Sequence, residues 1–164
     1  MSRRFNVKKE IRALGLDLCN PKRIVGVVVR GGLYLDGVVV FPKDFKQESR
    51  SVANEILRTR FYPELKLIMT HDPQDRLNIR QIEQKTRLPI IQLETTFSTR
   101  RRGFATFRAG KRSLLARSTL ETKTVQEVLA KTWTVGVFPE SLRVAHLIAK
   151  SHFREKTGLF WANK

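Results

Sequence analysis

Several side chains of this chain have the types and positions that chemistry requires. Asp17 lies in the middle of an apolar, β-branched segment, and Asp72 lies in a loop after another short apolar segment. Open α/β sheets bind ligands at the carboxyl ends of their strands, so the loop of Asp72 is placed for function. His146 lies on the apolar face of a predicted helix, where a histidine is either a packing residue or a ligand.

The single cysteine, Cys19, limits the chemistry further. One cysteine excludes an internal disulfide, and with three scattered histidines it offers no ligand set for zinc or an iron–sulfur cluster. A small residue that ends a buried strand is the ordinary use of a free cysteine. We therefore expect Cys19 to pack in the core rather than to act as a nucleophile.

The residues around Asp17 predict three antiparallel strands. Residues 11–18 and 23–30 are apolar and β-branched, and the turn at residues 20–22 is too short for anything but an antiparallel return. Gly31 and Gly32 can adopt the positive φ of a tight hairpin turn, so the third strand follows them directly.

Helices and strands alternate in the rest of the chain. A start signal at Asp44 and Gln47 resembles a capping box. Apolar stripes predict helices at residues 45–60, 78–86, 125–133 and 139–156. Short apolar runs predict further strands at residues 65–69 and 88–93, and the first of these two strands should be parallel. We therefore predict an α/β fold with a ribonuclease H-like mixed sheet, three antiparallel strands and then parallel strands, flanked by helices.

The net charge is the strongest signal in the composition. Lys and Arg number 32 against 15 Asp and Glu, which gives a net charge of +17. Phosphates relieve self-repulsion of this size, so we expect nucleic acid or a ribonucleoprotein as the partner. A solvated charged surface is the alternative, although such surfaces usually mix Glu with Lys. The sequence shows neither an apolar run of membrane-spanning length nor a signal peptide, so we expect a cytoplasmic protein with no membrane partner.

The domain organisation is simple. The length fits one domain over residues 11–164, preceded by a basic arm at residues 1–10 that we expect to be mobile until bound. Residues 95–117 have no clear period but interleave basic and aromatic side chains, which bind phosphates and stack on unpaired bases. The alternative is an extra hairpin or helix with its phenylalanines in the core. The predicted nucleic-acid contacts are Arg100, Arg101, Arg102, Phe104, Phe107, Arg108, Lys111 and Arg112.

Four stretches carry a resemblance to a known family. They are VKKEIRALGLDLCN, IVGVVVRGGLYLDGVVV, NIRQIEQKTRLPII and PESLRVAHLIA. They resemble the uncharacterised archaeal family of small proteins related to endonuclease V, over most of the chain and least between residues 95 and 130. The resemblance implies the ribonuclease H-like fold of endonuclease V, whose members bind a divalent metal with strand-borne carboxylates and cleave a phosphodiester near a deaminated base.

Carried over to this chain, the resemblance implies that Asp17 is a metal ligand. Mg²⁺ requires several hard oxygen ligands in an octahedral array, so Asp17 alone would not suffice. Thr70 and His71 replace the family's Asp-Gly pair, so Asp72 would have to supply the second ligand. Asp36 could contribute a third oxygen, although an Asp-Gly bulge explains it equally well. Arg143 could neutralise Asp17 in a packed network without chemistry. The other matches to family positions are Arg30, Gly31, Gly32 and His146.

Two functions follow from these observations. The first is a protein that binds nucleic acid or a ribonucleoprotein, with an endonuclease V-like fold and a degenerate metal site, since one buried carboxylate holds Mg²⁺ poorly. The alternative is an active Mg²⁺- or Mn²⁺-dependent endonuclease with Asp17, Asp72 and His146 in its catalytic site. We predict the first function, with no certain cofactor and no expectation about the oligomeric state.

Overall fold

A computed structural model describes residues 5–41, 48–96 and 102–155, with side chains as far as residue 151. These residues form a seven-stranded mixed sheet in the order β3-β2-β1-β4-β5-β7-β6. The strands are β1 (Arg12–Asp17), β2 (Val25–Arg30), β3 (Tyr34–Val40), β4 (Leu67–His71), β5 (Ile90–Glu94), β6 (Ala105–Ala109) and β7 (Arg112–Ser118). The helices are α1 (Ser49–Arg58), a short 3-10 turn at Tyr62–Glu64, α2 (Ile79–Thr86), α3 (Thr122–Thr132) and α4 (Glu140–Glu155).

The strand directions confirm the predicted ribonuclease H-like α/β fold. β1 pairs antiparallel with β2, and β2 pairs antiparallel with β3, so the expected meander is present. β1 also pairs parallel with β4, which pairs parallel with β5. The hairpin turn between β2 and β3 contains Gly31 in the left-handed region, at φ +57°.

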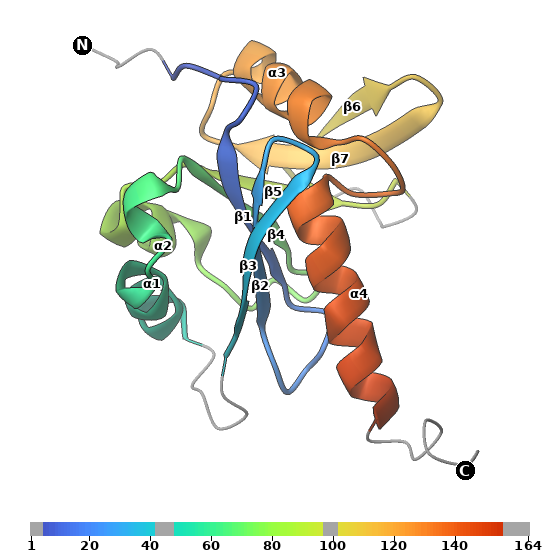
Figure 1. Ribbon diagram of the computed structural model, residues 1–164. Coiled ribbons are helices and arrows are strands. Elements are labelled where there is room, and N and C mark those ends of the chain that lie inside the picture. Colours follow the sequence, from blue (N-terminus) through green and yellow to red (C-terminus); the bar gives the residue numbers. More distant parts are fainter. Residues whose placement is uncertain (1–4, 42–47, 97–101, 156–164) are drawn as a thin grey trace.

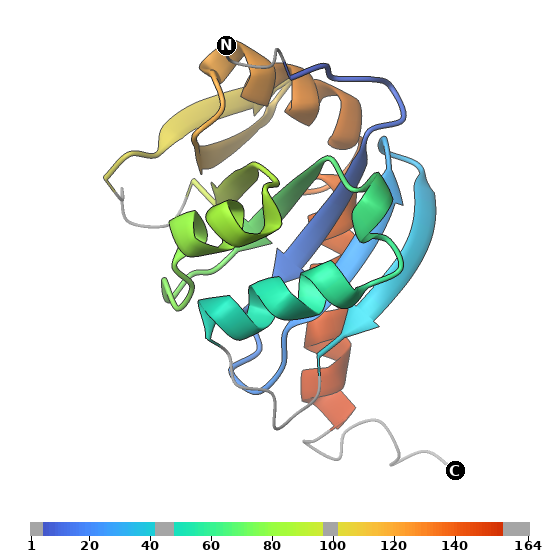
Figure 2. The same cartoon turned by 90° about the vertical axis from the view of Figure 1, so that its left-hand side faces the viewer.

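Helices cover both faces of the sheet (Figure 1). Figure 2 shows α1 and α2 in front of the sheet, with α4 behind it. The predicted apolar stripes are buried: Val52, Ala53 and Ile56 of α1 pack into one core cluster with Ile82 of α2. On the other face, α4 buries Leu142, Ala145 and Ala149.

The N-terminal segment differs from the expected mobile arm. Within residues 5–10, Val7 is buried in the core cluster beneath α3, and Phe5 packs against the same cluster. The carbonyl of Val7 accepts a hydrogen bond from Lys131 Nζ. Burial of apolar side chains therefore fixes residues 5–10 on the domain. Residues 1–4 lie outside the described residues, as does the expected capping box at Asp44 and Gln47.

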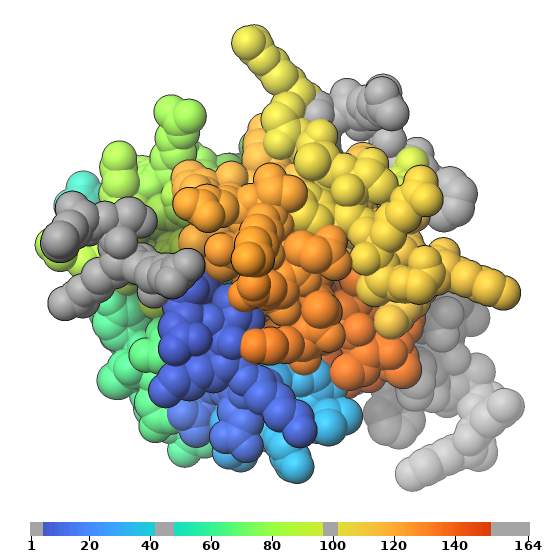
Figure 3. Space-filling model, turned by 90° about the horizontal axis from the view of Figure 1, so that it is seen from above, coloured from blue at the N-terminus to red at the C-terminus, as the bar shows by residue number. Residues whose placement is uncertain are grey.

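Residues 95–117 show no clear period in the sequence, and the described part of this segment contains the β6–β7 hairpin. β7 pairs antiparallel with β5, so the hairpin extends the central sheet. Phe107 is buried, which supports the alternative of an extra hairpin with an apolar contribution to the core. The hairpin lies beside α3 at one end of the molecule, and α3 separates it from the N-terminal residues (Figure 3).

β3 is one edge of the sheet and exposes apolar side chains to solvent. Leu33, just before the strand, is 75% exposed, and Tyr34, Leu35, Val38 and Val40 are also exposed. Among the described residues, no helix combines the length and apolar character that a membrane crossing requires.

Gly15 in β1 permits the closest approach between the sheet and α4. A Cβ at Gly15 would lie 2.5 Å from the backbone carbon of Ser141 and 2.6 Å from the backbone nitrogen of Leu142. A backbone cannot move aside as a flexible side chain can, so α4 lies against β1 only because position 15 has no side chain.

The substitution Gly15→Ala should therefore lower the free energy of unfolding by about 3 kcal/mol, the upper range for overpacking a core. Gly26→Ala on β2 is the matched control, because its Cβ would meet mainly side-chain methyls of Leu14 and Leu16, at 3.3 Å. This control should change stability by less than about 1 kcal/mol. Urea unfolding of the two variants tests the contact, and equal stabilities would contradict it.

Candidate functional site

Three neighbouring parallel strands end in ionisable residues. Asp17 ends β1, His71 ends β4 and Glu94 ends β5. Their exposed fractions are 0%, 7% and 4%. Charged groups are rarely buried without partners, and the carboxyl ends of parallel strands are the usual ligand sites of such sheets. These strand ends therefore form the candidate site.

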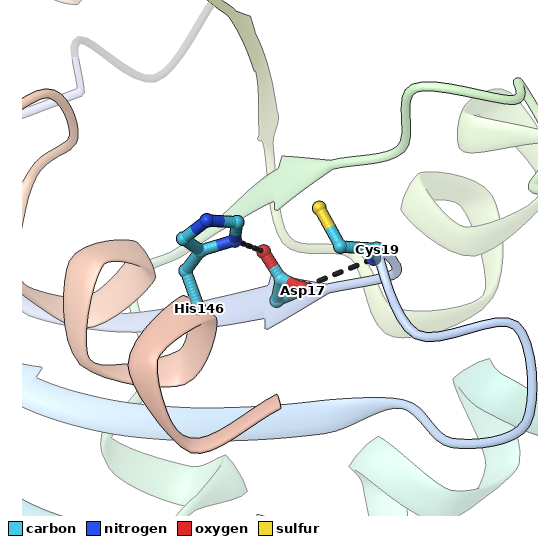
Figure 4. Close-up of side chains that lie close together, drawn as sticks. All are labelled: Asp17, Cys19 and His146. Atoms are coloured by element: carbon cyan, nitrogen blue, oxygen red, sulfur yellow. Dashed lines mark hydrogen bonds and ion pairs between the residues drawn. The ribbon is translucent and has the colours of Figure 1, made fainter. Parts of the chain in front are cut away.

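Asp17 has partners from two other segments (Figure 4). His146 Nδ1 on α4 lies 2.9 Å from Asp17 Oδ2, so this nitrogen donates a hydrogen bond to the carboxylate. The backbone N–H of Cys19 donates to Asp17 Oδ1 at 3.0 Å. The buried carboxylate is thus held from both sides, and His146 is its side-chain partner rather than a packing residue alone.

Cys19 completes a three-residue cluster. One potential ligand atom from each of Asp17, Cys19 and His146 can be chosen such that all three lie within 4.8 Å of one another. Burial, the Asp17 carboxylate and Glu94 raise the pKa of the Cys19 thiol to about 12, so the thiol is protonated at neutral pH. A protonated thiol is a poor nucleophile, as expected. The expectation that the cysteine and the histidines are scattered is wrong, because the fold gathers Cys19 and His146 at Asp17.

A second layer of polar and aromatic groups surrounds the cluster. His71 Nδ1 donates to the carbonyl of Leu93 at 3.0 Å and lies 3.6 Å from Glu94 Oε2. The ring of Phe138 lies 4.7 Å from that of His71 and 5.8 Å from that of His146, between ring centroids. Sequence reasoning missed Glu94, although an acid that ends an apolar strand was a usable signal.

Asp72 does not join Asp17. Asp17 is the register partner of His71, the last residue of β4, and Asp72 follows in the connection to α2. Its Oδ2 accepts a hydrogen bond from the N–H of Leu77 at 2.8 Å, and its Oδ1 lies 4.0 Å from Arg76 Nε. Its carboxylate thus organises the loop before α2, and the structure does not place it as a second ligand beside Asp17.

Asp36 lies elsewhere as well. Its two carboxylate oxygens accept hydrogen bonds from Arg12 and Arg30, each at 2.9 Å. Arg12 begins β1 and Asp17 ends it, so Asp36 lies at the opposite end of this strand. The expected third oxygen is therefore absent from the site among the described residues.

The remaining family-like positions have structural partners. Arg143 donates two hydrogen bonds of 2.7 Å to Glu140, so the carboxylate that it neutralises is Glu140 and not Asp17. Arg30 lies over the ring of Tyr34 besides binding Asp36. Gly32 faces Thr134, whose Cγ2 would lie 2.5 Å from an added Cβ. With the left-handed Gly31, these residues shape the β2–β3 turn and the start of α4.

The cluster does not fit Mg²⁺. Mg²⁺ demands near-octahedral coordination by hard oxygen ligands, whereas Asp17, Cys19 and His146 offer one carboxylate, one thiol and one imidazole. Since Asp72 and Asp36 lie elsewhere, Asp17 is the single carboxylate of this three-residue cluster. One carboxylate, one thiol and one imidazole suit a different class of metal ion, or a cluster that binds no metal.

The predicted nucleic-acid contacts divide into side chains that pack within the fold and side chains that are exposed. Phe107 is buried and cannot stack on a base, and Phe104 lies under the guanidinium of Arg117, 4.7 Å from it. Arg112 lies over the ring of Trp133 and donates to its carbonyl. The exposed members are Arg102, Arg108 and Lys111. Arg100 and Arg101 lie outside the described residues.

Comparison with known proteins shows the family. No family model matches the chain. A UPF0215 protein of Methanosarcina mazei is 30% identical to it, over 88% of this chain and 92% of the relative. The chain belongs to the UPF0215 family. Other members of the family come from Methanopyrus kandleri, at 29% identity over 87% and 91%, and from Methanosarcina barkeri, at 28% over 88% and 92%.

Two solved structures share the fold. A protein of unknown function from Archaeoglobus fulgidus matches with a TM-score of 0.68 and 17% identity, over 87% of this chain and 98% of the other. Argonaute of Marinitoga piezophila, solved with guide RNA and target DNA, matches with a TM-score of 0.59 and 9% identity. That match covers 90% of this UPF0215 chain but 30% of Argonaute. Both matches support the ribonuclease H-like architecture.

The Asp17–His146 pair gives a stability prediction. The variant His146→Ala should lower the free energy of unfolding by about 2–3 kcal/mol, because a buried carboxylate loses its side-chain donor. His146→Asn is the matched control, since the amide nitrogen of asparagine occupies nearly the place of Nδ1 and keeps a donor. Chemical denaturation at neutral pH measures both. If both variants lost the same stability, helix packing rather than the hydrogen bond would be the cause.

Asp36 gives a prediction about pH. Burial alone would raise its pKa, but hydrogen bonds from Arg12 and Arg30 outweigh burial and lower the pKa below 3.8. A lowered folded-state pKa contributes stability above the unfolded value, and this stability is lost as the pH falls through the folded value. Asp36→Asn should therefore melt below the wild type at about pH 6, and the difference should shrink towards about pH 3. A difference that stays constant with pH would contradict the assignment.

Proposed function

We propose that this chain is a nucleic-acid-binding protein, related to endonuclease V, whose ribonuclease H-like fold does not support Mg²⁺-dependent cleavage. One observation carries the proposal: the 26 residues from 95 to 120 contain seven Lys and Arg and no Asp or Glu. A solvated surface of mixed sign would not concentrate one charge in this way. The partner is nucleic acid, alone or within a ribonucleoprotein.

The position of the basic segment supports a contact surface. The described part of the segment forms the β6–β7 hairpin at the edge of the sheet, where Arg102, Arg108 and Lys111 are exposed. The N-terminal residues share this end of the molecule and carry the exposed Lys8 and Lys9 (Figure 3). Cations spread over one end of the molecule can follow a phosphate backbone, and backbone contacts supply most non-specific affinity.

The endonuclease alternative has weaker support. Cleavage by Mg²⁺ requires carboxylates gathered around the ion, and Asp72 and Asp36 are committed to other partners. Glu94 is a second buried carboxylate near these strand ends, but it lies beside His71. The relation to endonuclease V therefore concerns ancestry and fold in this proposal, and not activity.

The binding proposal predicts a strong salt dependence. A plot of log affinity against log salt should have a slope of roughly −4 or steeper for DNA or RNA oligonucleotides. The triple variant Arg102→Gln, Arg108→Gln, Lys111→Gln should make this slope less negative by about 2–3, because three phosphates lose their counter-charges. The control triple Arg50→Gln, Arg58→Gln, Lys85→Gln on α1 and α2 removes the same charge. Its slope should change by less than about 1.

Fluorescence anisotropy with labelled single- and double-stranded oligonucleotides measures these slopes. Affinity that hardly changes with salt, or equal effects of the two triple variants, would contradict the proposed surface. A cleavage assay with Mg²⁺ or Mn²⁺, with and without a deaminated base, accompanies the binding measurement. Cleavage that disappears in Asp17→Asn would refute the inactive site and favour the endonuclease.

A further inference from the structure

We infer that Asp17, Cys19 and His146 form a binding site for a transition-metal ion of the Zn²⁺ class, in place of the Mg²⁺ site of metal-dependent nucleases with this fold. The inference does not rest on nucleic-acid binding. It rests on which donor atoms the fold brings together.

The three donors come from three separate segments. Asp17 ends β1, Cys19 lies in the β1–β2 connection, and His146 lies on the second turn of α4. Figure 4 shows the thiol of Cys19 and the imidazole of His146 on either side of the Asp17 carboxylate. The donor atoms lie within 4.8 Å of one another, while donors around a tetrahedral Zn²⁺ are separated by roughly 3.5 Å. Small side-chain rotations therefore suffice to close the site.

The ligand types select the ion. A soft sulfur donor and an imidazole suit Zn²⁺ and similar transition metals, whereas Mg²⁺ and Ca²⁺ require oxygen ligands. Three protein ligands with one open position are the arrangement of catalytic rather than structural Zn²⁺ sites. A bound ion would release the thiol proton of Cys19 to solvent, and the proton on His146 Nδ1 would move to Nε2, so that Nδ1 and Asp17 Oδ2, now 2.9 Å apart, both face the ion.

The surroundings suit a bound cation. Asp17 is fully buried, but the side chain of His146 is 21% exposed and Cys19 is half-buried, so an ion can enter from the solvent side. Phe138 packs against the rings of both His71 and His146 and limits their rotation. Outer groups that hold ligands in place in this way raise metal affinity.

Cobalt gives a direct test, because Co²⁺ occupies Zn²⁺ sites and absorbs light. Full-length protein without a histidine tag, freed of metal by chelation, should bind one Co²⁺ and develop a thiolate-to-cobalt charge-transfer band in the near ultraviolet. Tetrahedral coordination should add visible bands of high intensity, and Zn²⁺ should displace the Co²⁺ stoichiometrically. Excess Mg²⁺ should not displace it.

Cys19→Ser is the main variant, because it leaves the Asp17–His146 pair intact and so should fold. It should abolish the charge-transfer band and weaken Zn²⁺ affinity by more than about 100-fold, since loss of an outer partner alone costs about 10- to 100-fold. Asp36→Asn, at the opposite end of β1, removes a carboxylate away from the site and should leave band and affinity unchanged.

Three results would overturn the inference. They are a Co²⁺ complex that lacks the thiolate band, Zn²⁺ affinity that Cys19→Ser leaves unchanged, and displacement of Zn²⁺ by Mg²⁺. Circular dichroism of each metal-free variant separates loss of a ligand from loss of folding. The salt-dependence measurement is independent of these results, so failure of the metal site leaves the proposed nucleic-acid binding to its own test.

Discussion

The contact of α4 with β1 at Gly15 sets the geometry of the candidate site. Because Gly15 has no side chain, the backbone at Ser141 and Leu142 lies directly on the strand. Two residues along a strand advance about 6.6 Å and four residues along a helix advance about 6 Å. Moving on by these steps from Gly15 and Leu142 leads to Asp17 and His146, which are hydrogen-bonded. The matching rises bring together two residues that are 129 positions apart.

The strands and helices could be predicted because their signals are local. Apolar runs, glycine turns and helical stripes predict the meander, the parallel strands and α4. Residues 95–117 lack such a signal, because Phe107 is the one buried residue of β6 and a single buried residue makes no alternating pattern. The site could be predicted only in part. Asp17 and His146 stand out by type and position, but their pairing depends on how α4 crosses the sheet. Cys19 lies near Asp17 through a local contact, two residues along the chain, and only its nearness to His146 is a tertiary effect.

The prediction that Asp72 lies beside Asp17 fails for a specific reason. Asp72 is one residue beyond His71, the register partner of Asp17, but its carboxylate accepts a hydrogen bond from the N–H of Leu77 in the connection to α2. The conformation of this connection, which sequence alone does not reveal, decides which acids meet. Strand order separates the cluster from the basic hairpin, because β6 lies four strand positions from β1, roughly 19 Å at the usual strand spacing. The proposed polyanion surface and the proposed metal site therefore occupy different parts of one sheet.

Because the edge strand β3 exposes apolar side chains, self-association of the protein depends on its net charge. β3 has a strand neighbour on one side only among the described residues, and an edge strand with outward apolar side chains is a template for pairing with another copy. At low ionic strength the net charge of +17 keeps copies apart. High salt, which strips nucleic acid from a basic protein, also shortens the Debye length to about 3 Å at 1 M and removes this repulsion. The conditions that would release the proposed polyanions are thus those in which the β3 edges of two copies associate most readily.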